Sequence, residues 1–111
     1  MKVIGHEPHG WFLLEERGAL ILDVNCSHSS FAYDFTIEMN ADEVAQYRSY
    51  GRIYVTLLAQ RIQDSVPILK ESMSAYKERG VMALYSDRIM AAVRAWSAGP
   101  AGIITFPKGP G

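Results

Sequence analysis

Hydrophobic and polar residues alternate regularly between residues 31 and 39, and this stretch runs directly into a helical pattern. The apolar positions are Phe31, Tyr33, Phe35, Ile37 and Met39. Because successive side chains of a strand point to opposite faces, this period of two places them together on one face of a β-strand. The residues between them are mostly polar, which favours an antiparallel sheet whose other face is open to solvent.

A long helix of about residues 41–63 is predicted directly after this strand. Asn40 suits the N-cap and Glu43 stands three residues later, which is a capping-box pattern. Apolar residues recur at helical spacing over roughly half of the helix surface. They are Val44, Tyr47, Tyr54, Val55, Leu58 and Ile62, and Tyr50 and Leu57 widen this side. Gly51 lies on the same side, where we expect close packing of the helix against the sheet, with a functional kink or a ligand contact as the alternative.

Two further strands are predicted before residue 31. Residues 11–15 and 19–26 have strand patterns, and Gly18 completes a short turn between them. Residues 1–10 are expected to be a loosely ordered lead-in, in which Val3 and Ile4 are able to start a short edge strand. The three strands, joined by short loops, predict a three-stranded antiparallel meander over about residues 11–39.

The helical signal is weaker after residue 64. Ser65 is a candidate cap for a second helix with Pro67 in its first turn, and Gly80 is its candidate end. Residues 81–85 fit either a strand or a helix. Ser86-Asp87 then starts another helix, whose apolar face contains Ile89, Ala92, Val93 and Trp96. The predicted fold class is therefore α+β, with the long helix and one or two shorter helices packed on one face of the sheet.

Length and composition place the chain among small globular proteins. Its 111 residues fit one domain, which we assign to residues 1–99, followed by a Gly/Pro-rich tail at 100–111. The formal net charge of −1 gives no general attraction to nucleic acid. Neither a signal peptide nor a membrane-spanning segment is predicted. The single cysteine, Cys26, excludes an internal disulfide and favours a cytoplasmic location.

Catalytic candidates gather at the tip of the hairpin formed by the second and third predicted strands. They are Cys26, His28 and Asp23, because a cysteine beside a histidine is able to form a reactive thiolate. However, Cys26 alternates with Leu22 and Val24, so a buried structural role is the alternative. His6 and His9 do not have the spacing of a helical zinc motif, and no CxxC is present. We predict no metal and no cofactor.

The polar face of the sheet is the broadest candidate binding surface. Its predicted residues are Asp23, Asn25, Asp34, Thr36 and Glu38. Such an acidic surface suits a basic partner, although a solvated face that keeps the sheet soluble is the alternative. Arg48 and Arg52 are one helical turn apart in the long helix and form a weaker candidate anion site.

Self-association is expected because apolar residues remain after the core has been assigned. Tyr50 and Leu57 flank the helix face, and Ile103, Ile104 and Phe106 form an apolar island in the tail. Twofold dimers are the commonest way to bury such patches. The leading hypothesis is a small cytosolic protein-interaction module of the regulatory, adaptor or toxin-neutralising kind, acting as a homodimer. The alternative is a small-molecule or metal-dependent enzyme that uses Cys26, His28 and Asp23.

Overall fold

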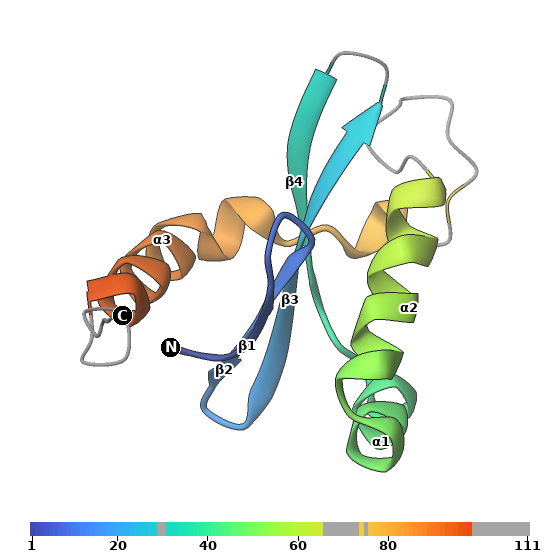
Figure 1. Ribbon diagram of the computed structural model, residues 1–111, viewed down its shortest axis with the longest axis horizontal. Coiled ribbons are helices and arrows are strands. Elements are labelled where there is room, and N and C mark those ends of the chain that lie inside the picture. Colours follow the sequence, from blue (N-terminus) through green and yellow to red (C-terminus); the bar gives the residue numbers. More distant parts are fainter. Residues whose placement is uncertain (29–30, 66–73, 75, 99–111) are drawn as a thin grey trace, which may run out of the picture.

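The computed structural model describes residues 1–28, 31–65, 74 and 76–98. In this part of the chain an antiparallel sheet lies between helices on its two faces (Figure 1). The four strands follow their sequence order: β1 (Lys2–Glu7), β2 (Trp11–Glu16), β3 (Ala19–His28) and β4 (Phe31–Glu38). The helices are α1 (Ala41–Tyr50), α2 (Arg52–Asp64), a short 3-10 helix η1 (Lys77–Arg79) and α3 (Met82–Ala98).

The predicted α+β class is confirmed, but the sheet has a fourth strand. β1 pairs with β2 in antiparallel register from Lys2↔Glu15 to Glu7↔Trp11, so the expected loose lead-in is wrong. A register shift between Val3 and Gly5 breaks the alternation of β1, and such a bulge hides a strand from a period-two pattern. The turn to β2 is closed by a 2.9 Å hydrogen bond from the Gly10 N–H to the Glu7 carbonyl.

One face of the sheet packs against α2. The buried apolar residues of β3 and β4 on this face, such as Leu22 and Ile37, alternate as predicted, and Leu13 of β2 joins them. They meet one stripe of α2, which is Val55, Leu58, Ala59 and Ile62. Burying these side chains supplies the main apolar stabilisation of this side of the fold.

The other face is covered by α3, so the prediction that the helices pack on one face is wrong. Leu14 and Ile21 are fully buried here against Ile89 and Ala92 of α3. Leu13 and Leu14 are consecutive and both buried, and adjacent strand residues point to opposite faces. Burial of both therefore requires a cover on each side of the sheet.

The chain crosses from one face to the other along the outer edge of β4. Gly80 forms an isolated antiparallel bridge with Ile37, and the Val81 N–H donates to the Thr36 carbonyl over 2.8 Å. This pairing covers part of an edge whose backbone groups would otherwise be open. α3 then begins at Met82, before the predicted start at Ser86-Asp87, because the Tyr85 N–H already donates to the Val81 carbonyl.

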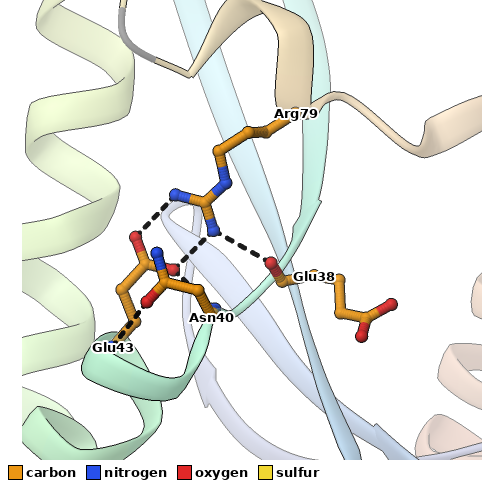
Figure 2. Close-up of polar contacts among 4 residues, drawn as sticks. All are labelled: Glu38, Asn40, Glu43 and Arg79. Atoms are coloured by element: carbon orange, nitrogen blue, oxygen red, sulfur yellow. Dashed lines mark hydrogen bonds and ion pairs between the residues drawn. The ribbon is translucent and has the colours of Figure 1, made fainter.

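The start of α1 is held by a capping box and by a distant arginine (Figure 2). The Asn40 side chain accepts from the Glu43 N–H over 2.8 Å, and the Asn40 N–H donates to Glu43 Oε1 over 2.9 Å, as the sequence predicts. Arg79 of η1 donates to both oxygens of Glu43, over 2.6 and 2.8 Å, and to the Glu38 carbonyl over 3.0 Å. This bidentate pair connects α1, β4 and the crossing segment.

The predicted long helix is two helices, because Gly51 interrupts it. The backbone of Gly51 has φ 70° and ψ −148°, a conformation that is open almost only to glycine. A Cβ atom placed there would meet no heavy atom within 4 Å, so the expected close packing against the sheet is wrong. The hydrophobic periodicity gave no sign of the break, because apolar positions continue on both sides of it.

Two predicted segments fall partly or wholly outside the described residues. Ser65 is the C-cap of α2, and its hydroxyl donates to the Ile62 carbonyl over 2.8 Å. The segment with Pro67 that was expected to be helical lies outside the described residues, as does the tail at 100–111.

Substitution of Gly51 distinguishes backbone strain from close packing. We expect both Gly51→Ala and Gly51→Leu to lower the free energy of unfolding by about 1–3 kcal/mol, because any Cβ strains this backbone. The two costs should agree closely, since the site has room for a side chain. Urea unfolding, with midpoint and slope compared, measures both. A leucine variant much less stable than the alanine variant would restore the close-packing explanation.

The Glu43–Arg79 pair should make stability fall in acid. Burial acts to raise the pKa of Glu43, but hydrogen bonds from Arg79 and the Asn40 N–H, with the charge of Arg79, lower it below its usual 4.5. A carboxylate whose pKa is lowered by folding stabilises the protein at pH values above its pKa in the unfolded state. This stabilisation is lost as the pH falls through its pKa in the folded state. Glu43→Gln should therefore cost about 1–3 kcal/mol near pH 7, and progressively less below pH 4.5.

Urea unfolding at a series of pH values tests this dependence. Glu78→Gln is the matched control, because Glu78 is an exposed carboxylate of the adjacent η1 helix. A cost of Glu43→Gln that stays constant down to pH 3 would contradict the ion pair as its source.

Candidate functional site

A large groove lies between the sheet and α3. Its volume is about 950 Å³. One side is formed by β2, β3 and β4, which place Phe12, Asp23, Asn25 and Asp34 in it. The opposite wall is one face of α3 from Ser86 to Ser97, and the β1–β2 turn closes one end. The groove therefore joins a polar strip of the sheet to a mainly apolar helix.

Two aspartates give this strip its charge. Asp23 of β3 accepts a 2.9 Å hydrogen bond from the Thr36 hydroxyl of β4. Burial raises the pKa of Asp23 to about 6, against the lowering effect of the Thr36 hydrogen bond, and the charge of Asp34 raises it further. Protonated Asp23 contributes to the stability of the fold. This contribution is complete below the usual pKa of 3.8 and is lost as the pH rises through about 6. The charged form of Asp23 is thus disfavoured by its own surroundings.

An aromatic cluster joins the groove to the end of α3. The rings of His6 and Phe12 are stacked with centroids 4.4 Å apart. Trp96 of α3 meets both rings edge-on, with its centroid 4.8 Å from His6 and 5.5 Å from Phe12. These contacts fix the position of the helix wall relative to the sheet.

The structure places two of the predicted catalytic residues, Cys26 and Asp23, on opposite faces of the sheet. Cys26 is buried among the residues that face α2, whereas Asp23 lies on the face toward α3. Burial raises the pKa of the Cys26 thiol to about 11, against a smaller lowering by its hydrogen bond with Tyr33. His28 is the last residue of β3, and its side chain lies outside the described part of the chain. Asp23 and the Cys26 thiol are therefore not part of one cluster, and the pairing of Cys26 with His28 lies outside the described part of the structure.

The predicted polar face exists, and α3 covers part of it. Asp23, Asn25, Asp34, Thr36 and Glu38 do share one face of the sheet, since their registers are Asp23↔Thr36 and Asn25↔Asp34. Thr36 is fully buried, and Glu38 accepts a hydrogen bond from the Tyr85 hydroxyl of α3 over 3.4 Å. Asn25, Asp34 and Glu38 remain exposed on this face, and Asn25 and Asp34 line the groove beside α3.

The predicted anion site of Arg48 and Arg52 is interrupted by Gly51, which lies between them and ends the shared helix. Arg52 donates to Glu7 Oε1 over 2.6 Å and to the His6 carbonyl over 2.8 Å, and its guanidinium lies 5.2 Å from the Trp11 ring centroid. It therefore binds a carboxylate of its own chain. Arg48 is exposed near a shallow hollow beside the β2–β3 turn.

A second candidate surface lies on the outer side of α1 and α2. Tyr50, Ile53 and Leu57 are 66 %, 77 % and 47 % exposed, and we call these three residues the Tyr50 patch. A shallow hollow of about 360 Å³ lies among them, with Tyr54, Gln46 and Arg61 at its sides. Tyr50 and Leu57 were singled out from the sequence. Ile53 was missed, although its spacing of three from Tyr50 and four from Leu57 gives a helical stripe.

The groove residues on α3 were also missed as a binding surface. Ser86, Met90, Arg94 and Ser97 follow helical spacing, so the helical pattern contained this signal. The predicted packing of all helices on one face of the sheet left no helix beside this groove.

Comparisons with known proteins add no relationship. No family model, no curated protein and no solved structure matches this chain. Among the described residues, no group of three or more His, Cys, Asp or Glu side chains is arranged to hold a metal ion. None of the described helices has both the length and the apolar character needed to cross a membrane.

Labelling of Cys26 tests its buried, protonated state. With a pKa of about 11, only about one thiol in ten thousand is a thiolate at pH 7. We expect a disulfide reagent to modify the native protein far more slowly than the urea-unfolded protein, which serves as the control. Equal rates in the two states would contradict this placement and restore Cys26 as a candidate nucleophile.

Proposed function

We propose that this chain is a small cytosolic protein-interaction module of the regulatory, adaptor or toxin-neutralising kind, and that it acts as a homodimer. The observation that carries the proposal is the Tyr50 patch. Three large apolar side chains stand exposed together on α1 and α2, on the side of these helices that the sheet does not use. Clustered apolar surface of this kind is typical of protein-binding sites.

A second copy of the chain is the occupant that the shape of the patch favours. An isologous interface must be complementary to itself, so it needs a protrusion and a hollow on the same surface. In the Tyr50 patch, Ile53 is 77 % exposed and lines the hollow together with Tyr54 and Leu57. A twofold axis through the patch lets each Ile53 enter the hollow of the other copy.

The edge of the patch is polar, as the rims of protein interfaces are. Gln46 of α1 and Arg61 of α2 line the hollow, so both helices contribute to the same rim. Tyrosine is also among the residues that contribute most to binding energy at interfaces. The apolar island of Ile103, Ile104 and Phe106 lies outside the described residues and stays a second predicted contact for the same dimer.

The oligomeric state of a charged variant tests the dimer. We expect the unmodified chain to sediment as a dimer at micromolar concentration and Ile53→Glu to sediment as a monomer, because the dimer would bury two unpaired carboxylates. Ile53 is mostly exposed in one copy, so this change should leave the fold intact. Circular dichroism melting checks that the variant is folded.

Leu84→Glu is the matched control, because Leu84 is 70 % exposed on α3 and lies outside the patch. It should remain a dimer. A monomeric unmodified chain at every concentration would contradict the proposal. A dimeric Ile53→Glu variant would remove the Tyr50 patch from the interface, and deletion of residues 100–111 would then test the tail.

A further inference from the structure

We propose that the groove between the sheet and α3 binds a lysine or arginine side chain carried by an extended segment of a protein partner. The groove lies on the opposite side of the sheet from the Tyr50 patch. The proposal therefore goes beyond the homodimer and does not depend on it.

The carboxylates of Asp23 and Asp34 are the recognition groups for the cation. They come from adjacent strands, β3 and β4, and both line the groove. Thr36 donates one hydrogen bond to Asp23 Oδ1. Among the described residues, no arginine or lysine forms an ion pair with either aspartate. A ligand cation would offset both the repulsion between the two carboxylates and the cost of keeping Asp23 partly buried.

The other charged residues of the groove leave its sheet side acidic. Glu7 also lines the groove, but its carboxylate is engaged by Arg52 over 2.6 Å. Arg94 is the one arginine among the lining residues, and it comes from the α3 wall. A cation therefore finds its partners on the sheet side. In the proposed complex, Arg94 binds a carbonyl or carboxylate group of the same segment.

The apolar part of the groove matches the aliphatic stem of a basic side chain. Phe12 lies on the sheet side, and Ile89, Met90 and Val93 lie on the helix wall. Lysine and arginine side chains pack their methylene groups on apolar surface while the charged end reaches polar groups. Met90 is 60 % exposed, and methionine adapts its shape to different ligands.

The groove is open, which favours a peptide segment over an enclosed small molecule. Asn25, Asp34 and Met90 are all exposed although they line it. Small-molecule pockets usually enclose most of the ligand surface. An open groove with a charged side, an apolar wall and a polar end instead allows a chain to pass through and leave one side chain inside.

Titration calorimetry with matched peptides tests the proposal on the full chain. The probe is the capped peptide Gly-Leu-Arg-Leu-Gly, and its control carries citrulline, which has the shape of arginine without the charge. We expect the arginine peptide to bind about tenfold more tightly or better, as expected for one charge-assisted contact. Equal affinity of the two peptides, or no detectable binding of either, would overturn the proposal.

Variants of the protein assign the effect to the groove. Asp34→Asn and Asp23→Asn should each reduce the affinity for the arginine peptide toward that for the citrulline peptide. Asp34 is exposed, so its variant should fold normally, and melting temperatures verify both variants. Asp42→Asn makes the same charge change on α1, outside the groove, and should leave binding unchanged.

Two further outcomes decide between ligand sources and sites. Agmatine carries the guanidinium on an alkyl chain without a peptide, and we expect it to bind much more weakly than the peptide. Affinity equal to that of the peptide would overturn the assignment to a protein partner in favour of a small amine. Unchanged peptide binding in both aspartate variants would overturn the groove as the site, whatever the oligomeric state of the chain.

Discussion

The ion pair between Glu43 and Arg79 is the contact on which the arrangement of the whole chain depends. Glu43 is only 7 % exposed, and a carboxylate so deeply placed remains charged only when it is paired and hydrogen-bonded. Its two oxygens receive the Asn40 N–H and the guanidinium of Arg79, which also binds the Glu38 carbonyl. One side chain thereby fixes where β4 ends, where α1 begins and where the chain passes toward α3.

Local chemistry made part of this fold predictable. The capping residues Asn40 and Glu43 act within one helical turn, and the turn at Gly18 joins neighbouring strands, so short stretches of sequence contain all the information needed. The break of the helix at Gly51 was harder to predict, because Gly51 changes the backbone conformation and leaves the spacing of the apolar residues unchanged. Arg79 is distant in sequence from Glu43, and no pattern in a single sequence reveals that they meet.

The candidate site shows the same division between local and distant information. The alternation along β3 and β4 correctly placed Asp23, Asn25 and Asp34 on one face. It also gave the inward direction of Cys26, which separates the thiol from Asp23. The groove itself could not be predicted, because it exists only where α3 lies beside that face. Knowing that a face is polar did not tell us which part of it a helix leaves accessible.

The two surfaces proposed for binding differ in chemistry and do not overlap. The Tyr50 patch belongs to α1 and α2, whereas the groove belongs to the sheet and α3. A dimer formed through the patch would present two acidic grooves at once. A partner with two basic segments would then bind more tightly than one with a single segment, because its second contact forms within the same complex.

The placement of α3 also has a consequence for how the chain folds as it is synthesised. His6, near the beginning of the chain, contacts Trp96, and Leu14 and Ile21 are covered by Ile89 and Ala92. Contacts between such distant parts form late, since the ends of a long loop must first be brought together. Until α3 has emerged from the ribosome, Leu14 and Ile21 are therefore still in water, and this part of the sheet remains prone to aggregation.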